Sequence, residues 1–369
     1  MAGDTIKTRL LIISDTHTAI PEIENAVSAS PGRDAAIAGK LRWPWQRDSS
    51  EDDNPLCTKR SSQATGQHAY RHPLPKADVL LHAGDLTMVG KPEEYKKVLS
   101  FLKSVDAELK LVIAGNHDIT LDREFFEEYG SWGKSPEFPV DLDEVREMWT
   151  GEDARSHGIV YLEQGTRTFT LKSGAKFTIF TSPYQPEFYN WAFAYEREED
   201  VYNPSCLSSR NPPLPTVPSF PEIDLMMTHG PPLKRLDRTR MDEPVGCEHL
   251  LKAVERARPR LHCFGHIHEG WGAERLQWKS KDHQETRLFE TDAEEEIESV
   301  ESIKVDMEKA VCERAVKVDI SQSSGKPLEF GKETLFVNAA IMDVRYMPVN
   351  APWLIDLDLP KAKSTSSST

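Results

Sequence analysis

Seven residues that can bind metal ions follow short apolar runs at five separate places in this sequence of 369 residues. Their side chains supply carboxylate, amide and imidazole donors, and no thiolate. This donor set suits Mn²⁺, Fe or Zn²⁺ at a catalytic site and argues against a structural cysteine-rich zinc site. Seven candidates exceed the needs of one ion and indicate two ions that share a bridging carboxylate. The candidates are Asp15, His17, Asp85, Asn116, His229, His266 and His268.

Any one of these residues, taken alone, would be better explained as a polar residue of the core or of a helix cap. The seven together are not, because buried carboxylates and imidazoles would be costly without an ion to pair with them. The other histidines lack the spacing of ligands and are expected to be structural. Among them, His82 lies close enough to Asp85 in the sequence to hold a metal ligand in place by a hydrogen bond.

The apolar runs predict the strands that position these residues. Residues 111–114 are too short for a helix and read as a strand buried on both faces, and residues 10–13 and 79–83 repeat the design. A helix that begins at Pro92 would join the strand at 79–83 to the strand at 111–114 in a βαβ unit. Because ligands bind beyond the carboxyl ends of strands in open α/β sheets, we expect the polar residues to meet in one crevice.

Later runs predict more strands, and two segments interrupt them. Strands are expected at 223–227, 261–264, 335–338 and 353–357, with an antiparallel portion over 159–184. Residues 31–76 lose this periodicity and read as an insertion or long loop, and residues 273–333 read as a second insertion that is partly helical, strongly acidic and solvated. The chain is therefore predicted to form a single domain over residues 1–360, followed by a disordered tail over 361–369.

The charge distribution excludes some partners. The net charge is −15, and residues 282–314 contribute twelve acidic against four basic residues, a net charge of −8. Without a basic stripe, neither stable nucleic acid binding nor binding to an anionic membrane surface is expected. No signal peptide is expected, and no apolar run approaches the ~20 residues of a membrane helix. The five scattered cysteines favour reduced thiols and a cytoplasmic location.

The ordered motifs resemble the signature of the calcineurin-like metallophosphoesterase superfamily, which is D-x-H, GD, GNH[DE], H and GHxH. The resemblance implies an α/β fold, a four-layer αββα sandwich with its dimetal site at the carboxyl ends of strands. It also implies that Asp15, His17 and His268 hold one ion, that Asn116, His229 and His266 hold the second, and that Asp85 bridges them. The matching stretches are Asp15-Thr-His17, Gly84-Asp85, Gly115-Asn-His-Asp118, His229 and Gly265-His-Ile-His268.

Within that superfamily the sequence is similar to the metallophosphoesterase-domain-containing (MPPED) family, which is related to class III cyclic-nucleotide phosphodiesterases. Some members carry Gly at the position of His266, whereas the ligand set here is complete. Protein Ser/Thr phosphatases instead carry GD-x-x-D-R-G, which the Leu-Thr-Met after Gly84-Asp85 does not match. The likeness is carried by stretches at 114–118, 182–191, 228–233, 245–250 and 264–272, and spans 8–30, 77–195, 222–275 and 334–360.

The expected function is metal-dependent hydrolysis of small phosphodiesters, such as cyclic nucleotides, rather than of monoesters. Two divalent ions, Mn²⁺ first and Fe or Zn²⁺ as alternatives, would make a bridging hydroxide available to attack phosphorus. His117 would protonate the leaving group, and Asp118 would orient its imidazole. The alternative is a metal- and nucleotide-binding scaffold with little turnover, which recruits a protein partner through residues 282–314.

Overall fold

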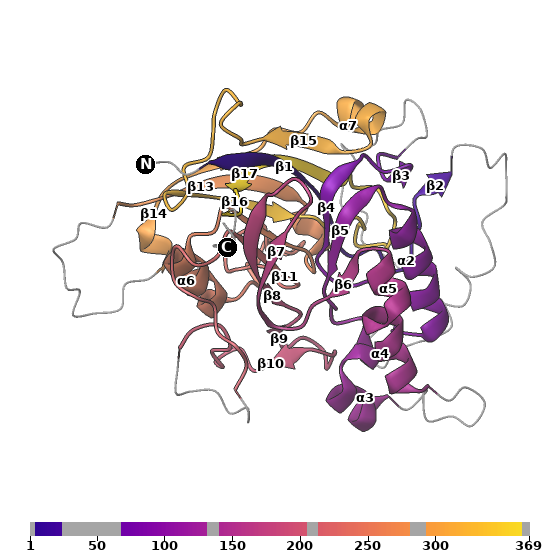
Figure 1. Ribbon diagram of the computed structural model, residues 1–369. Helices are drawn as coiled ribbons and strands as arrows, with labels where there is room; N and C mark the ends of the chain where they lie inside the picture. The colour runs from indigo at the N-terminus through magenta and orange to yellow at the C-terminus, as the bar shows by residue number, and fades with distance from the viewer. Residues whose placement is uncertain (1–3, 24–67, 131–139, 205–212, 281–292, 364–369) are drawn as a thin grey trace, which may run out of the picture.

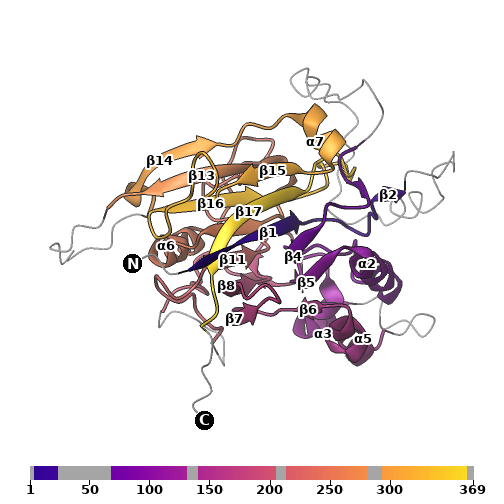
Figure 2. The same ribbon diagram turned by 45° about the horizontal axis from the view of Figure 1, so that its top comes forward.

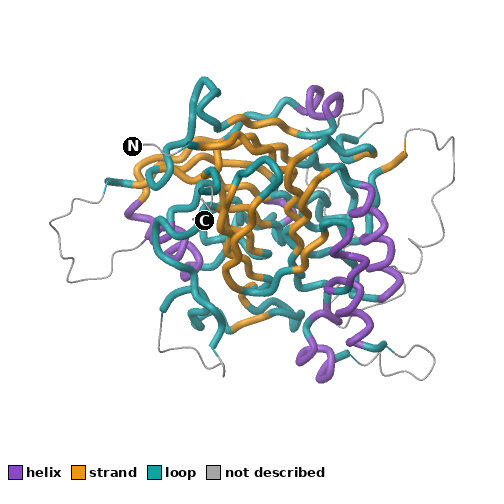
Figure 3. Tube along the Cα trace, in the orientation of Figure 1, coloured by secondary structure: helices purple, strands orange, loops and turns teal. Residues whose placement is uncertain are grey.

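Two β-sheets packed face to face form the centre of the protein, and helices cover the outer face of each sheet (Figure 1). This computed structural model describes residues 4–23, 68–130, 140–204, 213–280 and 293–363. Within these residues the layers run helix, sheet, sheet, helix, with strands in the middle and helices at the flanks (Figure 3). The predicted αββα architecture is therefore confirmed.

The first sheet has six strands, and four of them run parallel to one another. Strands β1, β4, β5 and β6 are the parallel set, whereas β17 pairs with β1 in the antiparallel direction. The helix expected after Pro92 is α2 (Pro92–Ser104), which joins β4 to β5. Helices α3 (Arg123–Tyr129), α4 (Leu142–Thr150) and α5 (Glu152–Ser156) follow β5. In order, the sheet contains β15 (Val316–Asp319), β17 (Trp353–Pro360), β1 (Thr5–Ile13), β4 (Ala77–His82), β5 (Ala107–Val112) and β6 (Ile159–Tyr161).

The second sheet has seven strands and again a parallel centre, made of β16, β12, β11 and β8. Helix α6 (Glu248–Ala257) comes between β11 and β12 in the chain and packs its apolar side on this sheet. None of the described helices is long and apolar enough to cross a membrane. In order, the sheet contains β14 (Ile297–Ser302), β13 (Gly272–Trp278), β16 (Glu333–Asn338), β12 (Leu261–Phe264), β11 (Leu225–Thr228), β8 (Lys176–Ser182) and β7 (Gly165–Thr170).

Short elements complete the described chain. They are the strand pairs β2 (Glu22–Ile23) with β3 (Arg71–His72) and β9 (Gln185–Pro186) with β10 (Ala194–Tyr195), the helix α7 (Met307–Glu313), and the 3₁₀ turns η2 (Ile119–Leu121), η4 (His268–Gly270) and η5 (Ala293–Glu296).

Alternation along the central strands explains why both faces of each sheet are covered. In β1, Leu10 and Ile12 point into the core between the sheets, and Leu11 and Ile13 point toward the helices. All four side chains are fully buried. Successive side chains of a strand point to opposite faces, so an unbroken apolar run requires a layer on each side. The apolar runs of the sequence are therefore what specify a sandwich.

The expectation of a solvated excursion over 273–333 is wrong for β13 and β15, which pair within the two sheets, whereas most of β14 is exposed as expected. Strand β13 pairs with both β16 and β14, and β15 joins the first sheet beside β17 (Figure 2). Two charged residues of β13 are buried and paired. In β13, Arg275 contacts Glu333 and Glu274 lies 3.2 Å from Arg235, with little exposure. Charged side chains tolerate burial when they are paired in this way.

Other expectations have mixed outcomes. Residues 159–161 form β6, which is parallel to β5, and antiparallel pairing begins only with β7 and β8. Most of the expected insertion over 31–76 lies outside the described residues, as does the tail from 364 onward. Lys361, placed in the expected disordered tail, forms a bridge with Ala175. The extent of the single domain over 1–360 stays a prediction.

Candidate metal centre

The carboxyl ends of five parallel strands bring the seven predicted ligands together. Three of these strands belong to the first sheet and two to the second. The site therefore lies where the carboxyl ends of the strands of both sheets come together. Each ligand comes within four residues of the end of its strand. Asp15 and His17 follow β1, Asp85 follows β4, Asn116 follows β5, His229 follows β11, and His266 and His268 follow β12.

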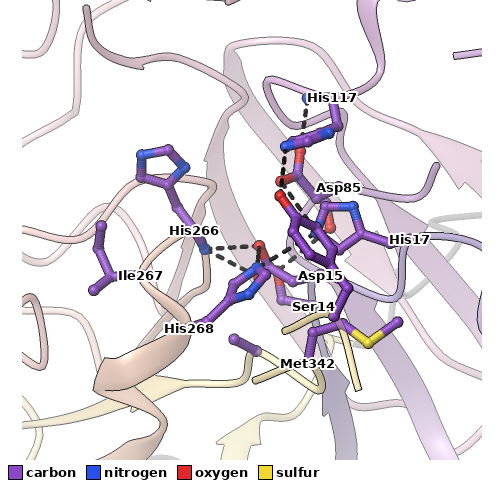
Figure 4. Close-up of polar contacts among 12 residues, drawn as sticks. Ser14, Asp15, His17, Asp85, His117, His266, Ile267, His268 and Met342 are labelled. Atoms are coloured by element: carbon purple, nitrogen blue, oxygen red, sulfur yellow. Dashed lines mark hydrogen bonds and ion pairs between the residues drawn. The ribbon is translucent and has the colours of Figure 1, made fainter. Parts of the chain in front are cut away.

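Asp15, His17 and His268 form a first group whose ligand atoms all lie within 4.8 Å of one another. Nε2 of His268 lies 3.4 Å from Oδ1 of Asp15 and 3.4 Å from Nε2 of His17. Figure 4 shows Asp15 between these two imidazoles. Three donors converging at this spacing can hold one metal ion.

Asp85, His229 and His266 form a second group of the same kind. Oδ1 of Asn116 lies 2.9 Å from Nε2 of His229 and 2.8 Å from Nδ1 of His266, so its amide belongs to this group as well. The two groups contain the same residues as the two ligand sets that the sequence motifs implied. Carboxylate, amide oxygen and imidazole are together suited to a borderline or hard divalent cation.

Asp85 lies between the two groups. Its Oδ2 is 3.6 Å from Nε2 of His17, and its Oδ1 is 3.4 Å from Nε2 of His229. One carboxylate oxygen thus faces each group, which is the arrangement that a bridging ligand requires. A third possible group joins Asp85 and His17 to His117, so the geometry also permits His117 to serve as a ligand.

Three of the imidazoles are fixed by backbone carbonyl oxygens, which can only accept a hydrogen bond. In each ring Nδ1 donates to the carbonyl, and Nε2 is the atom that faces the other candidate ligands. Such contacts orient a metal-binding ring and raise its basicity. The pairs are His17 with Thr87 at 3.1 Å, His229 with Ala83 at 2.9 Å, and His268 with Asp343 at 3.0 Å.

The backbone around the site is strained. Four of the candidate ligands have left-handed φ angles, which non-glycine residues rarely adopt and which cost roughly 1–3 kcal/mol each. Two glycines are required by close approach, because a Cβ at Gly265 would collide with the carboxylate of Asp15 and one at Gly115 with that of Asp85. The φ angles are 51° at Asp15, 43° at His17, 52° at Asp85 and 67° at His266.

Burial and mutual contacts shift the pKa values of these groups apart. Burial, with His117 nearby, lowers the pKa of His17 to about 3, and burial with His229 does the same for His266. Burial also acts to lower the pKa of His229, but the Asp85 carboxylate outweighs it and raises that pKa to about 9. The Asp85 carboxylate thus favours the protonated form of His229 where no metal ion is bound.

This pairing predicts that metal binding releases a proton. At neutral pH a cation that binds Nε2 of His229 must displace the proton held there, so metal affinity should rise with pH, by up to tenfold per unit, until about pH 9. Calorimetric titration with Mn²⁺ at pH 7, in two buffers of different ionisation enthalpy, should give at least one proton released per protein. Metal affinity that does not change between pH 6 and pH 9 would contradict the assignment.

His117 lies beside the two groups and is not oriented by Asp118 as expected. Its Nδ1 donates to the carbonyl of Met88 at 2.7 Å, and its ring stacks on Trp191 with centroids 4.2 Å apart. Its Nε2 lies 3.5 Å from the hydroxyl of Tyr346. A backbone carbonyl and an indole face therefore set the plane of this imidazole.

Asp118 instead stabilises, by hydrogen bonds, the turn that carries Asp85. Its carboxylate accepts hydrogen bonds from the backbone of Leu86, Thr87 and Gly115 at 2.9–3.0 Å, and from the Thr87 hydroxyl at 2.7 Å. Burial and the nearby Asp85 raise the pKa of Asp118 to about 7, and the hydrogen bonds from these donors oppose that rise. The expectation that it orients His117 is wrong.

His82 supports the turn that carries Asp15 and His17 by a hydrogen bond to a threonine. Its Nε2 lies 2.9 Å from the hydroxyl of Thr16, the residue between Asp15 and His17. His262 repeats this arrangement in the second sheet, 2.9 Å from the hydroxyl of Thr228, which precedes His229. Each sheet thus contains a fully buried histidine that supports a ligand turn.

Two aromatic residues belong to the site, and the sequence alone did not assign either of them to it. Trp191 lies in the aromatic segment 183–193, where it packs against the core beside the first sheet and stacks on His117. Tyr346 was not anticipated. Its ring lies edge-on to His17 and His268, at centroid distances of 4.8 Å and 5.5 Å. The one available signal was its place after the apolar run at 335–338.

Comparisons with known proteins find several relatives of this chain. The calcineurin-like phosphoesterase family model matches residues 8–270. Metallophosphoesterase domain-containing protein 1 from Homo sapiens is 31% identical over 297 residues, which are 78% of this chain and 67% of that protein, and the Mus musculus protein matches equally. A protein of Emericella nidulans named probable rhamnogalacturonate lyase C is 34% identical over 214 residues, 57% of this chain and 17% of that protein.

Among solved structures, a purple acid phosphatase from yellow lupin aligns with a TM-score of 0.35 and 12% identity, over 96% of this chain and 48% of that chain. The family model covers most of the sequence, including all the residues from Asp15 to His268 that make up the two ligand groups. The chain therefore belongs to the calcineurin-like metallophosphoesterases.

Proposed function

We propose that this protein is a binuclear-metal phosphodiesterase that hydrolyses small phosphodiesters, including cyclic nucleotides, in the cytoplasm. The observation that carries the proposal is the pair of ligand groups with Asp85 between them. Membership of a phosphoesterase family supports hydrolysis of a phosphoester bond. Family membership does not distinguish a diester from a monoester, so that part of the proposal depends on the residues around the ligands.

The donor set fits two divalent cations, with Mn²⁺ the first to test and Fe or Zn²⁺ as alternatives. When bound, such ions would supply positive charge beside the phosphoryl oxygens and a water of lowered pKa as nucleophile. In this proposal one ion is held by Asp15, His17 and His268, the other by Asn116, His229 and His266, and both by Asp85.

The surroundings of the ligands favour a diester. The group that leaves from an alkyl phosphoester is an alkoxide, which needs a proton in a monoester and a diester alike, and Nε2 of His117, the ring nitrogen that does not bind Met88, is the atom that can supply it. The loop of Trp191 also presents Phe188 and Tyr189 with more than half of each side chain exposed. Exposed aromatic rings on the loop whose Trp191 stacks on His117 can pack against the organic groups that a diester carries on both sides of phosphorus.

The test is a substrate panel with the full-length protein loaded with Mn²⁺, Fe²⁺ or Zn²⁺. We expect metal-dependent hydrolysis of bis(p-nitrophenyl) phosphate and of cyclic nucleotides, faster than that of p-nitrophenyl phosphate. Chelation should stop the reaction, and added metal should restore it. A protein that prefers the monoester, or that hydrolyses no diester with any of the three metals, would contradict the proposal.

The scaffold alternative predicts nucleotide binding to the metal-loaded protein without turnover. Its proposed partner would bind the acidic residues within 282–314, where Glu295 of η5 and Glu298 of β14 are exposed. Deleting the segment is not a clean test, because β14 and α7 lie in it. Charge reversal at Glu295 and Glu298 keeps the strand and should weaken partner capture if this alternative holds.

A further inference from the structure

Tyr346 reaches the site from a sixth strand end. It lies on the loop between β16 and β17, and β16 runs parallel to β12, so this loop starts at the same edge as the loops that carry the candidate ligands. The ring lies edge-on to three imidazoles, at 4.8 Å from His17, 5.5 Å from His268 and 6.0 Å from His117. Tyr346 therefore contacts two of the candidate ligands, His17 and His268, and the proposed proton donor, His117.

The position of this ring is built into the loop. The carbonyl oxygen of Asp343 accepts from Nδ1 of His268 at 3.0 Å and from the backbone N–H of Tyr346 at 2.9 Å. The Asp343 carboxylate accepts from the backbone N–H groups of Arg345 and Met347 at 2.8 Å and 3.0 Å. Tyr346 has a φ of 58°, a conformation that a non-glycine residue keeps only where its surroundings impose it. One carbonyl thus fixes both a candidate ligand and the tyrosine.

The hydroxyl of Tyr346 makes a long contact with His117. It lies 3.5 Å from Nε2 of His117, at the long limit of a hydrogen bond. Since Nδ1 of His117 already donates to Met88, Nε2 is the atom that the hydroxyl can donate to. Tyr346 is 41% exposed, so the residue is accessible from solvent while its ring contacts the buried imidazole of His17. A substrate that enters from solvent can therefore reach Tyr346.

We propose that the hydroxyl of Tyr346 donates a hydrogen bond to a non-bridging phosphoryl oxygen of the substrate. The inference rests on the proposed function and assigns that site a substrate contact outside the metal ligands. No covalent bond is made or broken by the tyrosine, and its proton stays on the hydroxyl. When the hydroxyl turns to the phosphoryl oxygen, Nε2 of His117 is released to face the leaving-group oxygen. A donor fixed in advance toward developing negative charge stabilises a transition state.

The test compares Tyr346→Phe with wild type, using the Mn²⁺-loaded full-length protein. The matched control is Tyr129→Phe, which alters an exposed tyrosine at the end of α3 whose ring packs on Phe125. Turnover of bis(p-nitrophenyl) phosphate gives kcat and KM, and calorimetry gives the affinity for inorganic phosphate. We expect Tyr346→Phe to lower kcat by about 10²-fold with little change in KM, and to weaken phosphate binding by about tenfold. Bound Mn²⁺ and thermal stability should match wild type.

The outcomes separate this inference from the proposed function. If wild type turns over and Tyr346→Phe equals it in both kcat and phosphate affinity, the tyrosine contact is wrong and the phosphodiesterase proposal stands. If wild type binds phosphate without turning over any diester, weaker binding by Tyr346→Phe supports the contact while the proposed function fails. Loss of Mn²⁺ from Tyr346→Phe would show a structural role and overturn the inference. Phosphate binding that is absent in wild type overturns it as well.

Discussion

Asp85→Asn should reduce turnover by about 10³-fold or more and lower the bound Mn²⁺ from two ions to at most one. The carboxylate lies between His17 and His229, with one oxygen toward each. Asparagine keeps the shape and the oxygen that accepts the backbone N–H of His117 at 2.9 Å, but removes the negative charge that both ions would share. Losing several kcal/mol of charge stabilisation corresponds to a rate loss of this size.

Metal content by elemental analysis and kcat with a diester substrate check this prediction together. The matched control is Asp106→Asn, which neutralises an exposed carboxylate just before β5, at the opposite end of the strand from the site, where it pairs with Lys76. Exposed ion pairs contribute little, so the control should keep both metal content and rate. An Asp85→Asn protein with two bound ions and undiminished turnover would show that Asp85 is not a shared ligand.

His117→Asn should lower kcat by about 10²–10⁴-fold for substrates with a poor leaving group, while leaving the bound metal unchanged. The asparagine amide can still donate to the carbonyl of Met88, which now accepts from Nδ1 of the imidazole. What is lost is Nε2, the atom that would carry the proton to the leaving group. An alkyl phosphodiester needs that proton, whereas an aryl diester that expels p-nitrophenolate needs it much less.

Comparing the two classes of substrate distinguishes catalysis from structure. A proton donor predicts a large loss with the alkyl diester and a small loss with the aryl diester. Equal losses with both substrates would indicate that His117 acts by another route. A loss of one bound ion would instead identify His117 as a metal ligand, which its grouping with His17 and Asp85 permits.

The parallel strands and their ligands could be predicted from the sequence because each signal is local. A buried run such as 10–13 or 111–114 is apolar on both faces of its sheet, and the polar residues that follow lie at the end of the strand. The order of the motifs then identified seven residues that the structure brings into two groups. These features depend on a few neighbouring residues each, so a sequence can reveal them.

Other features depend on partners that are distant in the chain. Strand β13 could not be predicted because its charged residues look solvated in the sequence. Their partners are distant: Glu274 pairs with Arg235, and Arg275 pairs with Glu333. Tyr346 enters the site only because β16 is parallel to β12, a pairing that no local pattern specifies. The role of Asp118 was misassigned for the same reason.

Anomalous diffraction at the manganese edge, from crystals of the Mn²⁺-loaded protein, tests the central claim most directly. It should show two peaks, one in contact with Asp15, His17 and His268, the other in contact with Asn116, His229 and His266, and Asp85 touching both. A single peak, no peak, or peaks away from these side chains would contradict a shared binuclear centre at the ends of the two sheets.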